Sequence, residues 1–382
     1  ENLSRPKPLS LTILEEMKPQ NTIEPSGGAS PAYKQVQRNG ASESFGCHPL
    51  PKTVSIRKTL ENIQAEAEAK GEVVAKVHFI YPRRLREEVQ EVAKGIIFPV
   101  LWTESDEDSG PGGVFIHRVK AESQRYLTFE GQPLGLLYKD KFSELCILSG
   151  IYGRTGDESH QTLEVFETIE TLLADAGMDY SHVARTWFYN DDILRWYGDF
   201  NRVRTRFFEK HKVFDHLLPA STGIGAKNPF GAALATAVFA VRDTSGKCHL
   251  REVGSPLQCP ATDYGSSFAR AVRFDTPEHR RLTISGTASI DESGETVFVG
   301  DFEAQYHKTH EVIAAILEAE GFSWQDVVRG VAYFRKEEDR QRAENLPLPD
   351  NFPVIRAVNV VCRDDLLYEL EINAVKSQSL NG

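Results

Sequence analysis

The stretch that decides the fold is FPVIRAVNVVCRDDLLYELEINAV at residues 352–375. In its last eight residues, Leu370 and Ile372 alternate with Glu369 and Glu371, and this period of two predicts a β-strand with one apolar and one acidic face. Two carboxylates on a buried strand face are costly unless they meet water, a cation or a ligand. Two interpretations follow: an edge strand whose acids face solvent, or a functional site.

The same stretch can be laid without a gap over LPASTGIGAKNPFGAALATAVFAV at residues 218–241. Upstream of both stretches, residues 147–189 resemble residues 283–334. The matched pairs are Ser149-Gly150 with Ser285-Gly286, Gly177 with Gly321, Arg185 with Arg329, Tyr189 with Tyr333, Thr222 with Arg356, Asn228 with Cys362, and Ala235 with Glu369. A duplication of this length predicts two copies of one unit, each a mixed sheet backed by helices in an α+β fold.

The two copies differ in charge. The second copy carries a group of polar residues where the first has uncharged or smaller ones: Arg356, Cys362, Glu369 and Glu371 replace Thr222, Asn228, Ala235 and Ala237. A scaffold role would require such groups in both copies. The asymmetry therefore favours a functional site in the second copy.

Composition limits the classes of partner. The chain has 382 residues, of which 40% are hydrophobic and 26% charged, and a net charge of −11 disfavours nucleic acid as a partner. We expect no membrane span, because no run of about 18 apolar residues occurs, and the N-terminus has no basic-then-apolar signal pattern. The five cysteines form no CxxC pair, which predicts free thiols in a reducing, cytoplasmic compartment and no metal site.

We predict four segments. Residues 1–50, rich in Pro, Ser, Gly, Asn and Gln, are expected to form a partly disordered tail. Residues 51–124 form an N-terminal extension or a degenerate third unit, residues 125–253 the first repeated domain, and residues 254–382 the second, which carries the site.

Two further segments contribute candidate ligand-binding residues. The linker GSPLQCPATDYGSSFARA at residues 254–271 brings Tyr264, Gly265, Ser266 and Arg270 toward the second copy, where a loop can lie against the site. An insertion at residues 196–215 contains Arg202, whose guanidinium suits a small anion. A solvated linker and a solvated helix face are the respective alternatives.

Four motifs together resemble the chorismatase family. They are STGIGA at residues 221–226, SSFARA at 266–271, SGTASI at 285–290 and CRDDLLYELE at 362–371. The resemblance covers roughly residues 125–378 and implies two tandem Rid/YjgF-like (chorismate mutase-like) domains behind an N-terminal extension. The loop ATDYGSSFARA is shorter than in many members of the family.

The resemblance implies the site and its chemistry. Glu369 would be the catalytic acid, and Cys362, which resembles the cysteine of the subgroup forming 3-hydroxybenzoate, would line the site or act as a base. The implied ligand-binding residues are Arg270, Arg356, Arg202, Tyr264, Gly265, Ser266, Thr222, Gly286 and Glu371. The implied reaction is release of pyruvate from the enolpyruvyl ether of chorismate or a related small carboxylate, without a metal or other cofactor.

Two other functions stay open at this point. A Rid-like hydrolase of an imine or enamine would keep Glu369 and Arg356 without needing two anion-binding groups. A non-catalytic protein that binds a small carboxylate is the other alternative. Since Rid-like proteins form trimers with ligand sites between subunits, we expect either a monomer with a pseudo-trimeric core or a homotrimer.

Overall fold

The deciding stretch forms two strands of one sheet, β16 (Val354–Val358) and β17 (Tyr368–Ser377). The computed structural model describes residues 34–51, 53–106, 112–347 and 352–378. Strand β17 lies between β14 (His279–Ala288) and β15 (Val327–Phe334), and both Glu369 and Glu371 are buried. The interpretation of an edge strand with solvated acids is therefore wrong.

The described residues form three mixed sheets, each backed by two helices. The third sheet has the order β12-β13-β14-β17-β15-β16 and the second β6-β7-β8-β11-β9-β10. The further strands of the third sheet are β12 (His249–Val253), β13 (Ala271–Asp275), β14 (His279–Ala288) and β15 (Val327–Phe334). Those of the second are β6 (Ser123–Phe129), β7 (Gln132–Lys139), β8 (Ser143–Tyr152), β9 (Val183–Asn190), β10 (Ala220–Gly225) and β11 (Leu234–Asp243).

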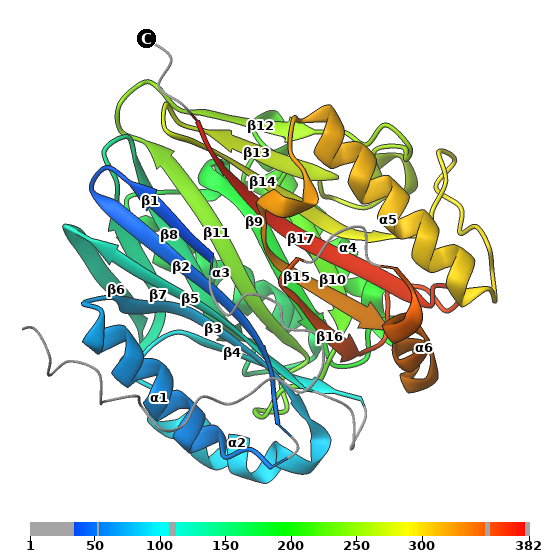
Figure 1. Cartoon of the computed structure of the whole chain (residues 1–382), viewed down its shortest axis with the longest axis horizontal. Coiled ribbons are helices and arrows are strands. Elements are labelled where there is room, and N and C mark those ends of the chain that lie inside the picture. Colours follow the sequence, from blue (N-terminus) through cyan, green and yellow to red (C-terminus); the bar gives the residue numbers. More distant parts are fainter. Residues whose placement is uncertain (1–33, 52, 107–111, 348–351, 379–382) are drawn as a thin grey trace, which may run out of the picture. The chain divides into compact units, whose positions relative to one another are not determined.

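The first sheet repeats this order with one strand fewer, β1-β2-β5-β3-β4. Its strands are β1 (Lys34–Arg38), β2 (Ala41–Pro49), β3 (Val73–Pro82), β4 (Val100–Ser105) and β5 (Gly113–Ala121). In Figure 1, α1 and α2 lie along this sheet, and α5 lies along the sheet that contains β14 and β17. The helices are α1 (Ile56–Ala69), α2 (Arg86–Val92), α3 (Glu158–Asp175), α4 (Ile193–Lys210), α5 (Phe302–Ala319) and α6 (Glu337–Arg342).

The duplicated sequence produces duplicated local structure. The side chains of Asp157 and Asp301 cap the N-termini of α3 and α5 by accepting from the backbone N–H three residues on. Gly177 and Gly321 follow these helices with φ of +69° and +71°, the left-handed conformation that ends a helix at low cost for glycine. The prediction of two copies with the same element order is confirmed.

The last third of the expected tail, residues 34–49, is part of the first sheet. Residues 34–49 form β1 and β2, which pair through a turn at Asn39 and Gly40, whose φ is +87°. An Asn-Gly pair between two short runs is a hairpin signal, and the polar composition around it obscured that signal. Residues 1–33 of the expected tail lie outside the described residues, and the division into domains stays a prediction.

The gapless alignment is wrong by one residue in the parallel edge strands. The registers of β9 and β15 make Trp187 equivalent to Val331, and these two residues pair with Thr222 and Ile355, respectively. Thr222 therefore corresponds to Ile355 and not to Arg356. A one-residue shift moves a strand side chain to the opposite face of the sheet, so this error matters for the site.

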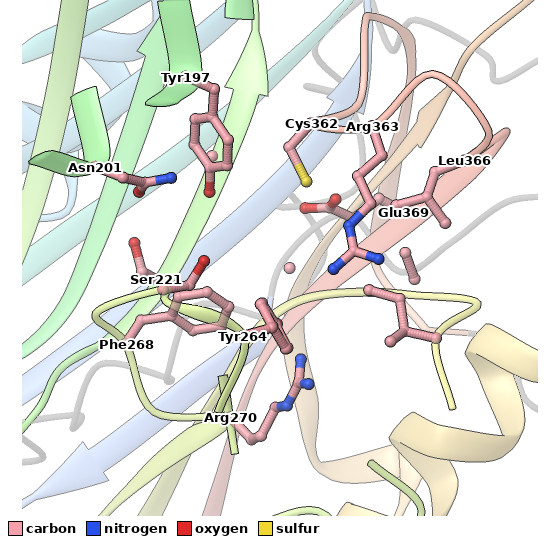
Figure 2. A pocket seen from close by; sticks show the side chains of 15 residues that line it. Tyr197, Asn201, Ser221, Tyr264, Phe268, Arg270, Cys362, Arg363, Leu366 and Glu369 are labelled. Atoms are coloured by element: carbon pink, nitrogen blue, oxygen red, sulfur yellow. The ribbon is translucent and has the colours of Figure 1, made fainter. Parts of the chain in front are cut away.

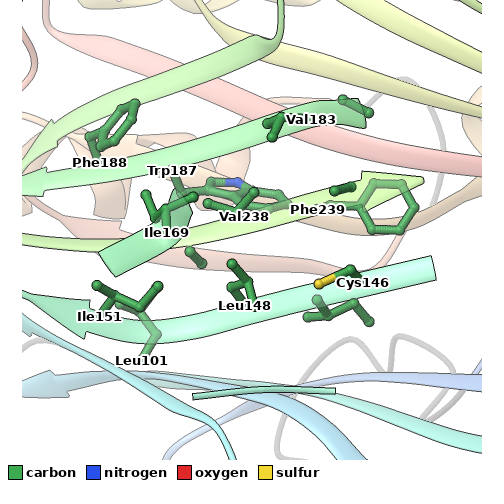
Figure 3. Close-up of a cluster of buried hydrophobic side chains, with 14 of the residues drawn as sticks. Leu101, Cys146, Leu148, Ile151, Ile169, Val183, Trp187, Phe188, Val238 and Phe239 are labelled. Atoms are coloured by element: carbon green, nitrogen blue, oxygen red, sulfur yellow. The ribbon is translucent and has the colours of Figure 1, made fainter. Parts of the chain in front are cut away.

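The three sheets contact one another in a cycle. The first sheet contacts the second through β3 and β4, which lie against β8. The second contacts the third through β9 and β10, which lie against β13. The third contacts the first through β15 and β16, which lie against β2. The largest apolar cluster joins residues from more than one sheet, as Figure 3 shows for Leu101 of β4 beside Ile151 of β8. This arrangement brings the inner faces of the sheets together and creates the contact between β10 and β14 at which the candidate site lies.

Candidate functional site

A pocket lies where β10 of the second sheet meets β14 and β17 of the third (Figure 2). Its cavity volume is about 220 Å³, which suits a small molecule. The lining residues are Tyr197, Asn201, Ser221, Gly223, Tyr264, Ser266, Phe268, Arg270, Gly286, Ala288, Ile290, Cys362, Arg363, Leu366 and Glu369. The sequence-predicted residues among them are Glu369, Cys362, Arg270, Tyr264, Ser266 and Gly286.

The Glu369 carboxyl rests directly on Gly286. A Cβ atom built on Gly286 would lie only 1.9 Å from Oε1 of Glu369 and 2.9 Å from its Cδ, so any side chain there would displace the carboxyl. The register between β14 and β17 shifts between Ile284 and Thr287, opposite this position. This β-bulge, together with the missing side chain, makes the space that Glu369 occupies.

Burial keeps the Glu369 carboxyl protonated. Its side chain is enclosed. Burial, and then the neighbouring Glu371, raise the pKa of the Glu369 carboxyl to about 8, although Arg185 opposes the shift. At neutral pH most of the carboxyl is therefore in the acid form, with a proton to donate into the pocket.

Glu371, two residues further on the same strand face, has a different environment. Although burial alone would raise its pKa, the guanidinium groups of Arg329 and Arg185 hold the pKa of Glu371 below its usual value. The ion pairs measure 2.8 Å to Arg329 and 2.6 Å to Arg185. Glu371 is thus an ionised core residue outside the pocket wall, and its expected role in contacting substrate is not supported.

The two arginines bound to Glu371 are a matched pair from the repeat. Arg185 lies next to the register shift between β9 and β11, and Arg329 next to the one between β15 and β17. Lys76 lies next to the equivalent shift between β3 and β5 of the first sheet. All three side chains contact the ring of Trp187, with Lys76 Nζ 3.9 Å from its centroid and the guanidinium carbons of Arg185 and Arg329 at 4.9 and 5.4 Å. The first copy has Ala237 at the position equivalent to Glu371 and therefore has no carboxylate of its own there. Among the described residues, Glu371 alone forms ion pairs with Arg185 and Arg329, the arginines of both sheets.

Thr222 connects this charged core to the pocket. Its Oγ1 donates to Glu371 Oε2 at 2.5 Å and accepts from the backbone N–H of Gly286 at 2.9 Å. Thr222 does not line the cavity. It holds the backbone of Gly286, against which Glu369 packs. Thr222 was expected to bind substrate, and the structure instead places it behind the pocket wall.

Cys362 lines the pocket beside Glu369 (Figure 2). Burial, and then the nearby Glu369, raise the pKa of its thiol to about 12. A thiol with that pKa stays protonated at neutral pH, which favours a lining role over a role as base.

The linker loop reaches the pocket as expected. A short 3₁₀ turn, η5 (Ala261–Tyr264), ends at Gly265, whose φ is +83°, and this turn directs Tyr264 and Ser266 to the cavity. Arg270 Nε donates to the carbonyl of Cys259 at 2.9 Å, which holds the guanidinium in place. Gly265 itself shapes the loop and does not line the cavity.

Two predicted anion-binding arginines lie elsewhere. Arg202 is exposed on α4 and paired with Asp199. Arg356 pairs with Ala332 on the sheet face that also carries Leu370, where its charge acts on His310 of α5. Arg356 is therefore on the helix-covered face, opposite to Glu369. The one-residue alignment error explains why it was expected on the other face.

Several pocket residues had not been identified from sequence. Tyr197 and Asn201 come from α4, and Arg204, buried below them, donates to Asn201 Oδ1 at 2.7 Å. Arg363 follows Cys362 and lines the cavity. The signal for Arg363 was present in CRDDLL, but a residue in a non-periodic loop gives no indication of the direction of its side chain.

The equivalent contacts between the other sheets place different groups against the matching glycines. At Gly150, the counterpart of Gly286, an added Cβ would lie 2.3 Å from the carbonyl oxygen of Val100. At Gly113, the counterpart of Glu369, it would lie 2.3 Å from Ile355 Cγ2. A backbone carbonyl and an apolar side chain therefore lie against these two glycines, whereas the carboxyl of Glu369 lies against Gly286.

Metal sites and membrane-spanning helices are both absent from the described residues. In residues 34–51, 53–106, 112–347 and 352–378, no three His, Cys, Asp or Glu side chains gather as metal ligands. None of the helices in these ranges has the length and apolarity needed to cross a membrane.

Comparison with known proteins identifies related chains. No protein-family model matches. A chorismatase of Streptomyces hygroscopicus is 29% identical over 245 residues, 57% of this chain and 68% of the relative. A chorismatase of Streptomyces rapamycinicus is 30% identical over 240 residues, 55% of this chain and 68% of the relative. A chorismatase crystal structure superposes with a TM-score of 0.61 at 20% identity, covering 86% of this chain and 98% of that one, which confirms the expected fold class.

Proposed function

Because this chain belongs to the chorismatase family, we propose that it releases pyruvate from chorismate, or from a closely related dicarboxylate with an enolpyruvyl ether. The observation that carries the proposal is the buried Glu369 carboxyl, which lines a small pocket together with Arg270 and Arg363 and whose pKa is raised by burial. An enol ether is cleaved by acid, and a buried carboxylic acid with a raised pKa is suited to start that reaction at neutral pH.

The proposed first step is a proton transfer to carbon. The O–H bond of Glu369 breaks as the π electrons of the enol form a C–H bond at the methylene carbon, which leaves an oxocarbenium ion and the Glu369 carboxylate. Water then adds to the cation and passes one proton to the Glu369 carboxylate, which restores the acid. The resulting hemiketal separates into pyruvate and the ring alcohol, and its hydroxyl proton passes to the alcohol oxygen. Loss of water from the ring alcohol would give 3-hydroxybenzoate, the product associated with a cysteine at the position of Cys362.

The pocket residues have distinct proposed roles. Arg270 binds a carboxylate, since a guanidinium offers a planar set of donors that matches a carboxylate. Tyr264 donates to an oxygen of the substrate, and Cys362 bounds the space beside the acid as a neutral thiol. Glu371 and Thr222 act behind the pocket wall, and no cofactor takes part in these steps.

The threefold arrangement of sheets supports a proposal about assembly. Three sheets of the same strand order contact one another in a cycle within one chain, and the candidate pocket lies at one of these contacts. We therefore propose a monomer with a pseudo-trimeric core and one site per chain. The five cysteines are free, which fits a reducing, cytoplasmic setting.

The direct experiment is incubation with chorismate. We expect chorismate to be consumed and pyruvate to appear in equal amounts, measured by its reduction with lactate dehydrogenase. Chromatography of the second product would separate 3-hydroxybenzoate from the ring alcohol. Absence of both chorismate loss and pyruvate would reject the proposal and favour a binding protein, whereas turnover of an imine but not of chorismate would favour the Rid-like hydrolase.

A further inference from the structure

Two guanidinium groups line the pocket on either side of one tyrosine ring. The guanidinium carbon of Arg270 lies 5.3 Å from the centroid of the Tyr264 ring, and that of Arg363 lies 5.2 Å from the same centroid. Figure 2 shows Tyr264 between them in the view, with Arg363 nearer to Glu369. The pocket thus has two separate cationic positions and a rigid aromatic spacer between them.

Neither guanidinium is neutralised by the protein. Arg270 Nε donates to a backbone carbonyl, that of Cys259, and Arg363 Nη1 donates to the carbonyl of Gly294 at 2.8 Å. Among the described residues, neither arginine has a carboxylate within ion-pairing distance. The ring of Tyr264 attracts both cations, but a cation–π contact does not cancel their charge. Each guanidinium therefore keeps donors and positive charge for an anion in the pocket.

The burial of Arg270 strengthens this argument. The side chain is only 5% exposed, and its Nη2 has no hydrogen-bond partner among the residues that the structure describes. A buried donor without a partner is costly and is satisfied when a ligand binds. Arg363 is half-buried and comes from a different segment, the loop between β16 and β17, so the two cations reach the pocket from independent elements.

We propose that Arg363 binds a second carboxylate, the one on the enol group that accepts the Glu369 proton, while Arg270 binds the ring carboxylate. This inference rests on the proposed function. The assignment follows from position: Arg363 is next in the chain to Cys362, which lies beside Glu369, whereas Arg270 lies on the far side of Tyr264. The pocket then selects dicarboxylates over monocarboxylates, because each arginine left without its anion would remain uncompensated.

The test divides the substrate into its two halves. Chorismate binding is measured by calorimetry in the inactive Glu369→Gln background, and binding of pyruvate and of 3-hydroxybenzoate by NMR titration of the otherwise unaltered protein. Arg363→Gln should weaken chorismate binding about 10- to 100-fold and pyruvate binding similarly, while 3-hydroxybenzoate binding changes less than about twofold. Arg270→Gln should weaken 3-hydroxybenzoate binding and spare pyruvate.

A matched control removes a surface charge. Arg125 is about half exposed and ion-paired with Asp175 away from the pocket, so Arg125→Gln should leave all three affinities unchanged. Parental chorismate affinity in Arg363→Gln, or equal weakening of both fragments by both variants, would overturn the inference while pyruvate release from chorismate still upheld the proposed function. Conversely, if chorismate were not turned over but isophthalate bound and lost affinity in both variants, the two-anion site would stand and the proposed function would fail. If no dicarboxylate bound, both would fail.

Discussion

Replacing Gly286 by alanine should remove activity without unfolding the protein. The added methyl carbon would lie 1.9 Å from Oε1 of Glu369, whereas non-bonded carbon and oxygen atoms require more than about 3 Å, so the carboxyl must move by more than about 1 Å. A displacement of that size at the reacting group costs on the order of 100-fold in rate. The other nearby atom, Thr222 Cγ2, lies at 3.3 Å and needs to yield only slightly.

The backbone should tolerate this change. Gly286 does not have a positive φ, so alanine adds no backbone strain, and overpacking of this kind typically lowers the free energy of unfolding by about 1–3 kcal/mol. We therefore expect kcat for pyruvate release to fall roughly 100-fold or more, while the thermal unfolding transition stays cooperative. Gly254→Ala is the control, because no atom of the described part of the chain lies within 4 Å of the added Cβ, and it should keep parental kcat and stability. Parental kcat in Gly286→Ala would refute the position assigned to the catalytic carboxyl.

The remaining predictions concern pH, the charged core and assembly. Because the acid form of Glu369 is needed and its pKa lies at about 8, kcat/KM should fall above about pH 8; a fall centred near pH 4.5 would contradict this. The same raised pKa means that the folded state binds more protons than the unfolded state, so unfolding free energy should decrease as pH rises from about 5 to about 8, and Glu369→Gln should abolish this part of the decrease in urea titrations. Glu371→Gln should lower unfolding free energy by about 3–5 kcal/mol, since it leaves the buried Arg185 and Arg329 without their carboxylate; unchanged denaturation midpoints would show that these ion pairs do not stabilise the core. Light scattering should give the mass of one chain at low micromolar concentration, and a mass of three chains would reject the monomer.

The sequence predicted the duplicated unit and the alternation of side chains along its strands. The period of two in β17 placed Glu369 and Glu371 on one face, and the duplication located equivalent pairs such as Arg185 and Arg329. The linker composition indicated that Tyr264 and Arg270 approach the site. These features follow from local rules that a single chain displays directly.

What the sequence could not predict depends on register and on helix phase. One extra residue between β16 and β17 moved Arg356 to the helix-covered face, and no local pattern reveals such a shift. On α4, Arg202 and Arg204 are two residues apart, which is roughly 200° around a helix, so one is exposed while the other is buried below the pocket. Arg363 lies in an irregular loop, whose side-chain directions are set by tertiary contacts such as that with Gly294.

The different fates of Glu369 and Glu371 also arise from tertiary structure. Their spacing makes them equivalent. Yet Glu371 meets two guanidinium groups, one from β9 of the second sheet and one from β15 of its own sheet, whereas Glu369 meets a glycine and a cavity. The environment shifts their pKa values in opposite directions, which supports the proposal that Glu369 is the acid.

The most direct test of this account compares Glu369→Gln with the parental protein in pyruvate release from chorismate, together with chorismate affinity by calorimetry. Glutamine keeps the shape of the side chain but has no proton to transfer to carbon. We predict that turnover falls by about 10²–10⁴-fold while chorismate affinity stays within a few-fold of the parental value. Pyruvate release near the parental rate would contradict the assignment of Glu369 as the acid and, with it, the proposed chemistry.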